Sequence, residues 1–259
     1  MKFASLGSGS KGNALLISAS SGTSSTTVML DCGFGIRETE RRLARLDVHP
    51  SGLSAIIVTH EHHDHIGGAF KFARRHRLPV WLSYGTYQAA IKDSYDVDLN
   101  FCRDGDPISI GDLQFLPFTV PHDAREPLQF CASNGNSKLG ILTDAGQSTP
   151  HLIQALAVCD ALMIECNHDS EMLSRSGYPM SLKRRIRGVL GHLSNDDTSA
   201  ILANLDQTRL KKVVGAHLSL QNNTPELARN ALCAAIHTGQ TEVVVACQQD
   251  GFGWIDTQS

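Results

Sequence analysis

Short apolar runs separated by turn residues recur along the chain and predict a fold rich in β-sheet. Ten of these runs are expected to form strands, over residues 2–6, 13–17, 26–30, 54–58, 79–83, 113–118, 138–143, 161–165, 211–216 and 242–246. Apolar residues at helical spacing lie between several of them, over residues 35–46, 66–77, 84–92, 148–157, 195–206 and 225–237. Strands that stand alone at first and later alternate with helices predict sheet layers covered by helices.

Helix-capping residues and the absence of linkers refine this picture. Asn195 or Asp196 is expected to cap the helix over 195–206, and Thr224 followed by Pro225 is a typical start for the last helix. The chain contains no low-complexity linker and no short-period repeat. We therefore expect one domain over residues 1–259, built from two similar halves that meet near residues 120–135.

Composition places the protein in an ordinary globular class. The 259 residues are 41% hydrophobic and 19% charged, and the net charge of −3 exerts no general attraction on nucleic acid. Seven cysteines, an odd number without a C-x-x-C pair, suit a reducing compartment. No apolar run approaches the ~18 residues that a membrane span needs, and no signal-type core follows the N-terminus. We expect a cytoplasmic protein that does not enter a membrane.

The segment HEHHDH, residues 60–65, follows the predicted strand over 54–58 after a single residue, Thr59. His60 and His62 are two residues apart and can project to the same side, whereas Asp64 and His65 come at the turn into a helix. Imidazole binds zinc, iron and manganese, and a carboxylate favours the harder of these ions. The spacing H-x-H-x-D-H therefore predicts metal binding.

These four side chains are too few for two metal ions, so further ligands are expected where other strands end. His122 lies in PHDAREP, Asp144 in LTDAG and His217 in GAHLS, each just after an apolar run. Loops at strand ends are the usual carriers of functional groups. Each of the three residues alone is more simply structural, but together with the 60–65 segment they predict a shared site.

The order of these motifs resembles the metallo-β-lactamase superfamily over essentially the whole chain. The resemblance rests on H-x-H-x-D-H after a strand, LDCG upstream, and then a lone His, a lone Asp and a late His. Finer strings are similar to the YycJ/WalJ group, a bacterial branch linked with DNA exonuclease activity: SLGSGSKGN, LDCGFG, THEHHDHIGG, PHDAREP, ECNHD, GHLSN and HLSLQNN.

This resemblance implies an α/β fold, a four-layer αββα sandwich, with a site for two divalent metal ions. It implies His60, His62 and His122 as ligands of one ion, Asp64, His65 and His217 as ligands of the other, and Asp144 as the bridge between them. It also implies that Asp31 in LDCG is buried and orients the metal-binding loop without binding metal itself.

The chemistry of such a site favours a phosphodiester substrate. Two cations ~3.5–4 Å apart that share a water supply a bridging hydroxide at neutral pH. Histidine and aspartate ligands without cysteine leave the ions strongly cationic, which suits an anionic ester. This ligand set accepts zinc, manganese or iron, so the sequence does not identify the metal.

Glu165 and His192 resemble a glutamate–histidine pair of the superfamily's nuclease branches, such as RNase Z. In that role His192 gives a proton to the leaving oxygen, Glu165 holds its ring, and both join Asp64 among the expected catalytic residues. Alternatively, Glu165 orients a ligand and His192 caps a helix. His192 and His217 share the string HLS, and the strand-like KKVVGA before His217 favours His217 as the ligand. His168 is either a partner of a metal ligand or a surface residue.

A basic run, SLKRRIR at 181–187, precedes His192 and is the best candidate for binding a phosphate backbone. The residues expected to contact substrate are Lys183, Arg184, Arg185 and Arg187, with Asn222 and Asn223 as hydrogen-bonding partners. The alternative interpretation is a solvated helix face. The glycine-rich GSGSKGN at 7–13 does not match a P-loop and predicts a tight hairpin, whose Lys11 touches substrate only if the tip reaches the site.

Two absences narrow the function further. The 73 residues from Asp144 to His217 leave no room for the large inserted domain of RNase J-type enzymes, and no long arm of the RNase Z kind is evident. The leading hypothesis is therefore a metal-dependent phosphodiesterase acting on nucleic acid, a DNA exonuclease in its sharpest form. The alternatives are a small-molecule hydrolase of the same fold (a thioesterase or a cyclic-nucleotide phosphodiesterase) and a non-enzymatic module that metals stabilise. DNA or RNA preference, polarity of digestion and oligomeric state stay open.

Overall fold

A computed structural model describes residues 1–258 and arranges their strands in two seven-stranded sheets. The first sheet has the order β14-β1-β2-β3-β4-β5-β6, and its strands span Phe252–Asp256, Lys2–Gly7, Ala14–Ser21, Ser24–Leu30, Ala55–Ile57, Val80–Leu82 and Leu99–Phe101. The second has the order β13-β12-β11-β10-β9-β8-β7, spanning Glu242–Val245, Lys212–Ala216, Ala161–Glu165, Lys138–Leu142, Leu128–Ser133, Leu113–Thr119 and Ile108–Ile110. All ten predicted strands are present.

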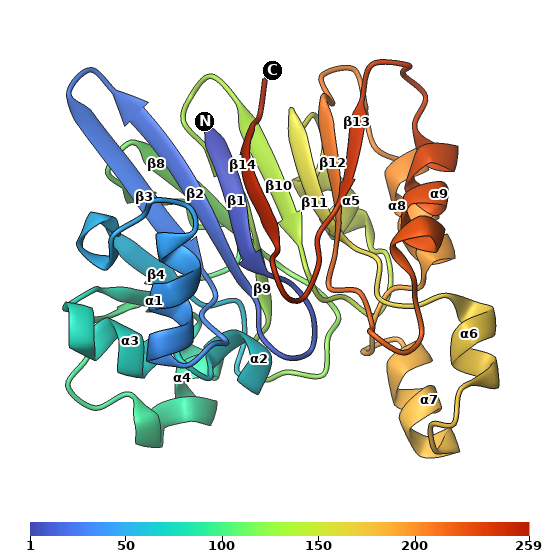
Figure 1. Ribbon diagram of the computed structural model, residues 1–259, viewed down its shortest axis with the longest axis horizontal. Helices are drawn as coiled ribbons and strands as arrows, with labels where there is room; N and C mark the ends of the chain where they lie inside the picture. The colour runs from blue at the N-terminus through green and yellow to red at the C-terminus, as the bar shows by residue number, and fades with distance from the viewer. Residues whose placement is uncertain (259) are drawn as a thin grey trace.

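Helices cover the outer face of each sheet (Figure 1). On the first sheet lie α1 (Ile36–Ala44), α3 (Ala69–His76) and α4 (Tyr84–Ala90), and on the second α5 (Pro150–Ala155), α8 (Asn195–Ala203) and α9 (Pro225–Ala235). The remaining helices are α2 (His63–Ile66), α6 (Ser170–Arg175), α7 (Met180–Arg187) and the 3-10 turns Pro50–Gly52 and Ile91–Asp93. The predicted four-layer αββα sandwich is therefore confirmed.

Successive side chains of a strand point to opposite faces of the sheet, so each sheet contributes to two hydrophobic clusters. In β4, Ile57 packs in the cluster between the sheets, whereas Ile56 belongs to the cluster under the helices of the first sheet. In the second sheet, Met163 of β11 faces the central cluster and its neighbours Leu162 and Ile164 face the helical layer. Burial of these three clusters holds the layers together.

The parallel strands set the position of the site. Strands β3, β4 and β5 pair in parallel in the first sheet, and β10, β11, β12 and β13 do so in the second. The carboxyl ends of parallel strands meet at the same edge of a sheet, and ligands bind at such edges. Residues that follow β3, β4, β10 and β12 are therefore brought together.

The structure corrects several predictions. The chain passes to the second sheet between Phe101 and Ile108, so a junction near 120–135 is wrong: the hairpin β7–β8 already pairs with β9. Ser194, not Asn195 or Asp196, caps α8, because its hydroxyl accepts from Asp197 N while the Asp197 carboxylate accepts from Ser194 N. The Thr224–Pro225 start of α9 is confirmed.

Some elements escaped prediction because their sequences carry weak signals. Strands β6 and β7 have three residues each, β14 contains a glycine, and in β9 the polar Gln129 interrupts the apolar residues Leu128 and Phe130. Helix α7 contains the basic run 181–187, which agrees with the alternative interpretation of this run as a helix face. Within residues 1–258, no helix has the length and apolar character needed to cross a membrane.

Candidate metal centre

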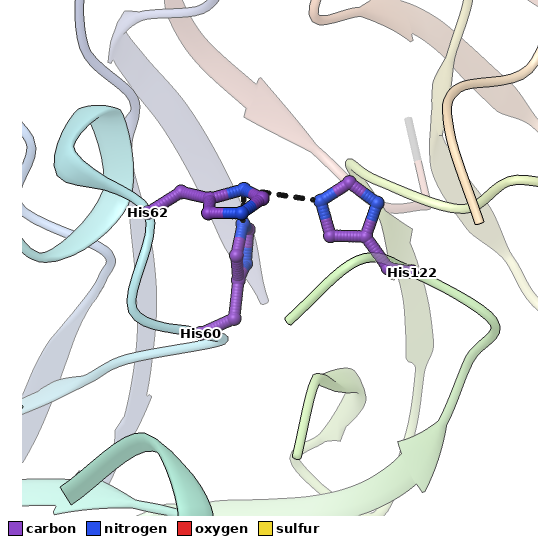
Figure 2. A group of neighbouring side chains, drawn as sticks. All are labelled: His60, His62 and His122. Atoms are coloured by element: carbon purple, nitrogen blue, oxygen red, sulfur yellow. Dashed lines mark hydrogen bonds between the residues drawn. The ribbon is translucent and has the colours of Figure 1, made fainter. Parts of the chain in front are cut away.

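Three imidazole rings converge after β4 and β8. His60 Nε2 lies 3.0 Å from His62 Nδ1, and His122 Nε2 lies 3.2 Å from the same atom (Figure 2). The other nitrogen of each ring meets an oxygen: Thr59 Oγ1 at 2.9 Å for His60, the Asp123 carbonyl at 3.3 Å for His62 and the Gly191 carbonyl at 3.0 Å for His122. Rings that donate to these oxygens carry lone pairs on the nitrogens that face one another. Such an arrangement suits a cation.

A second group gathers beside the first. Asp64 Oδ2 lies 3.2 Å from His217 Nε2 and 3.5 Å from His65 Nε2. His65 Nε2 is also 3.1 Å from Asp144 Oδ2. Because Asp144 faces both His65 and, at 3.9 Å, His122 Nε2, it stands between the two groups.

The residues present fit a metal ion. Ligand atoms of His60, His62 and His122, of Asp64, His65 and His217, and of His60, His65 and Asp144 lie within 4.8 Å of one another in each group. Asp144 is 1% exposed, and its Oδ2 has no hydrogen-bond partner within residues 1–258. A buried carboxylate oxygen without a donor is costly unless a cation satisfies it. The site is therefore able to bind divalent metal.

Asp31 contacts one of the candidate ligands, His65, on the side of the ring away from the centre. It follows β3, is 1% exposed, and accepts a hydrogen bond from His65 Nδ1 at 2.8 Å. Its other oxygen accepts from Thr59 N at 2.9 Å. The proton on His65 Nδ1 leaves Nε2 free to face Asp64 and Asp144, an arrangement that suits a buried aspartate that orients a metal ligand.

Glu165 and His192 form a pair at the side of the centre. Glu165 ends β11, is fully buried, and accepts from His192 Nδ1 at 2.7 Å, from Ala145 N at 3.0 Å and from Leu193 N at 3.2 Å. His192 Nδ1 also lies 3.3 Å from Asp144 Oδ1. The ring is held through Nδ1, so Nε2 is the nitrogen left for other partners.

Buried carboxylates give the centre a negative potential. Burial tends to lower the pKa of His192, but the Glu165 carboxylate and the bonds to Asp144 raise it to about 10. For His217, burial is likewise outweighed by Asp144 and Asp64, and the pKa rises to about 9. The pKa of His60, by contrast, falls well below its usual value through burial and the neighbouring His65. Positive charge is thus favoured at the side where the carboxylates gather.

A cleft of about 360 Å³ opens over the centre. The predicted site residues in its lining are His62, Asp64, Asp144, Arg185, His192 and His217. Tyr178, Leu182 and Ile186 add apolar surface, and Ser10 shows that the tip of the glycine-rich hairpin reaches the cleft. The predicted hairpin itself is confirmed, since it joins the antiparallel strands β1 and β2.

The predicted substrate strip is only partly at the cleft. Within residues 1–258, Arg185 is the one cation of the strip that lines it, bonded through Nε to Asp123 Oδ2 at 2.6 Å. Arg184 and Arg187 are exposed elsewhere on α7, because residues at positions 182, 185 and 186 share the face that meets the cleft.

Three further residues do not fit the predicted contact with substrate. Lys183 is 8% exposed and its ammonium donates to the carbonyls of Ser174 and Ser176, both at 2.7 Å, so this prediction is wrong. The predicted substrate contact of Asn223 is also wrong, since Asn223 is buried and hydrogen-bonded to Asn195 and to the Cys166 carbonyl.

Asn222 and His168 are buried outside the cleft lining. Asn222 is 1% exposed and donates to Ser219 Oγ, so it too does not contact substrate. His168 is 2% exposed, which excludes the surface alternative, and burial lowers its pKa to about 4. Its backbone, through a bridge to Ser194, joins β11 to the start of α8.

Several residues that position the centre were not predicted from the sequence. Asn13 Nδ2 contacts Asp64 Oδ2 at 3.3 Å, and Ser8 Oγ accepts from His217 N at 2.9 Å. Both belong to GSGSKGN, whose polar residues were the available signal. Asp123, between His62 and Arg185, directly follows His122 and could have been found from that position.

Comparisons with known proteins agree with this architecture. The model of the β-lactamase superfamily domain matches residues 26–217. The exodeoxyribonuclease YycJ of Bacillus anthracis is 36% identical over 88% of this chain and 86% of its own length, and the exodeoxyribonuclease WalJ of Streptococcus pneumoniae is 33% identical over 88% and 85%. Zn²⁺-bound PqqB of Methylobacterium extorquens superposes with a TM-score of 0.75 at 16% identity, over 99% of this chain and 100% of PqqB.

Proposed function

Because the chain belongs to the β-lactamase superfamily, in its YycJ/WalJ group of metal-dependent hydrolases, we propose that it is a dinuclear phosphodiesterase that degrades DNA from an end. The observation that carries this proposal is the convergence of two ligand groups on Asp144, a buried carboxylate with an unsatisfied oxygen. The names of the two curated relatives supply the expected substrate, and Arg185 at the cleft is able to bind a phosphate.

Each ligand group would hold one divalent cation, zinc, manganese or iron. One cation would be held by His60, His62 and His122, the other by Asp64, His65 and His217, and both by Asp144. When bound, such a pair lowers the pKa of water and neutralises charge on a phosphoryl group. His217 is preferred over His192 as ligand because its Nε2 faces Asp64, whereas His192 is bonded to Glu165.

His192 would act as the proton donor in this hydrolysis. In this hydrolysis a water oxygen would bond to phosphorus and release its proton to solvent as the bond between phosphorus and the ester oxygen breaks. The electron pair of the broken bond would stay on the ester oxygen, which would take a proton from His192 Nε2. Glu165 keeps the ring in the orientation that presents Nε2 and stabilises its protonated form. Arg185, restrained by Asp123, would hold a non-bridging oxygen of the substrate.

The substrate is tested with end-labelled duplex DNA, single-stranded DNA, RNA and a thioester, each incubated with protein loaded with zinc, manganese or iron. Release of mononucleotides from DNA is expected. A volume of about 360 Å³ is also suited to a small molecule, which makes a thioesterase or cyclic-nucleotide phosphodiesterase the second candidate. Activity confined to the thioester would end the nuclease proposal.

The role of His192 as proton donor is tested by comparing substrates whose leaving groups do and do not need a proton. His192→Ala should lower kcat on DNA by ~10²–10⁴-fold. Cleavage of bis(p-nitrophenyl) phosphate, whose leaving group departs without a proton, should change little. His151→Ala is the matched control, because His151 is an exposed histidine that also faces a carboxylate, that of Asp104. An equal loss on both substrates, with metal content intact, would exclude the role as proton donor.

A further inference from the structure

A short loop beside the cleft holds two large aliphatic side chains in solvent. The loop is Gly188–Gly191, between α7 and His192, and its side chains Val189 and Leu190 are 62% and 49% exposed. Gly191 and His192 themselves line the cleft. Single exposed apolar residues are common, but an adjacent pair at the rim of a site indicates binding.

Backbone contacts hold this loop in place. Gly191 N donates to Gly188 O at 2.7 Å, and Asp123 N donates to Leu190 O at 2.9 Å. A Cβ on Gly191 would lie 2.2 Å from Arg185 O, and one on Gly146 would lie 2.3 Å from Val189 O. These hydrogen bonds and close backbone neighbours support the conformation in which Val189 and Leu190 are exposed.

The surroundings of this pair match the end of a nucleic-acid duplex. Helix α7, which ends directly before this loop, presents the exposed cations Arg184, Arg185 and Arg187. Cations on the same element favour the phosphate backbone, and apolar side chains favour the flat face of a terminal base pair. The cations that precede the loop on α7 make a polyanion the favoured occupant of this surface.

The size of the cleft determines how much of a nucleic acid can enter it. About 360 Å³ is near the lower end of the range of small-molecule sites, ~300–1,000 Å³, so a single strand fits the cleft more readily than a duplex. Opening a duplex at its end would let one strand reach His192. Proteins open base steps by inserting aliphatic side chains between them.

We propose that Val189 and Leu190 form a wedge that packs on the terminal base pair of duplex DNA and separates it, so that one strand enters the cleft. This inference rests on the proposed nuclease function. The wedge breaks no covalent bond; it binds an open end and leaves the chemistry to the centre.

The test replaces both residues, as V189S/L190S, and compares three substrates of one sequence. On blunt duplex, kcat/KM should fall about tenfold or more. On single-stranded DNA and on a duplex with mismatched ends, it should stay within about twofold of wild type. The double variant of Ile91→Ser and Leu116→Ser is the control, since these exposed side chains do not line the cleft; it should match wild type on all three substrates.

A binding measurement gives a readout that does not depend on turnover. A duplex carrying 2-aminopurine at its last base pair should brighten with wild-type protein and not with V189S/L190S. Equal losses on all three substrates, or equal fluorescence, would overturn the wedge. So would a change from dimer to monomer with duplex activity unaltered, which would make the patch an interface between copies. Wild-type protein that leaves all DNA intact would refute the nuclease function instead.

Discussion

Replacing Asp31 by asparagine should weaken metal binding without changing any ligand. In the wild type, His65 Nδ1 donates to Asp31 Oδ2 at 2.8 Å, and Thr59 N donates to Oδ1 at 2.9 Å. The asparagine oxygen can serve Thr59, which leaves the amide NH₂ facing His65. Two donors then oppose each other, and the ring proton moves to Nε2. That nitrogen is 3.1 Å from Asp144 Oδ2, so a new hydrogen bond would occupy two ligand atoms at once.

The size of the effect follows from the bond that is lost. A hydrogen bond to a charged group contributes about 1.5–3 kcal/mol. At 1.4 kcal/mol per tenfold change in an equilibrium constant, this corresponds to a metal affinity lower by about 10–100-fold. The same range is typical for substitutions of residues that orient metal ligands. Asparagine also tolerates the backbone of Asp31, whose φ is 61°, so the fold should be retained.

The assay is a titration of metal-free protein with Zn²⁺ against a chelating indicator, with imidazole nitrogen shifts recorded by NMR. Asp47→Asn is the matched control, because Asp47 is an exposed aspartate with a similar φ of 55°. Zinc binding by Asp31→Asn as tight as that of wild type, or a ring proton that stays on His65 Nδ1, would refute this role of Asp31.

Four further outcomes are expected. Lys183→Met should lower the free energy of unfolding by about 1–3 kcal/mol, since two backbone carbonyls lose their buried donor, while kcat/KM of the folded protein stays unchanged; urea denaturation and steady-state assays check this. Asn13→Ala should reduce metal affinity about tenfold by freeing Asp64 from the hairpin, whereas unaltered zinc titrations would show that the contact is incidental. Saturating metal should raise Tm. At a free metal concentration of a hundred times Kd the stabilisation should be about 2.7 kcal/mol, and a chelator should reverse it. In Asp144→Asn most of this rise in Tm should be lost. Burial lowers the pKa of His168 to about 4 in the folded state, so the stability that its neutral form supports is complete above the unfolded value of about 6.5 and declines as pH falls from there toward 4. His168→Gln should flatten that part of a Tm–pH curve.

The sequence predicted the loops that meet at the candidate metal centre because the signals for these loops are local. His60, His122 and His217 each follow an apolar run, and an apolar run predicts a strand from neighbouring residues alone. Parallel pairing of these strands is then enough to place the loops that follow them at the same edge of each sheet. The same logic failed for the junction between the sheets, since whether β7 and β8 join the first or the second sheet depends on pairing partners far away in the chain.

Residues that restrain the site were missed because their partners are distant. Ser8 bonds His217 across 209 positions, and Asn13 meets Asp64 across 51. Lys183 was wrongly predicted to contact substrate, because its charge is visible in the sequence but its partners are not. The two carbonyl groups that accept from its ammonium come near it only when the end of α6 lies beside α7. Charge predicts solvent exposure on average and gives no information about a particular backbone contact.

Backbone strain identifies functional positions in this fold when it is considered together with burial. Six residues other than glycine within residues 1–258 have a positive φ, and four of them, Asp47, Arg77, Asp96 and Val158, lie in exposed turns. The other two, Asp31 and His217, are 1% and 3% exposed and follow β3 and β12. A left-handed residue of this kind costs on the order of 1–3 kcal/mol and persists only where its surroundings fix it. Asp31 N donates to Ile57 O, and His217 N donates to Ser8 Oγ, so both backbones are held. The strain turns one side chain toward His65 and the other toward Asp64, which is why neither strand continues straight past the centre.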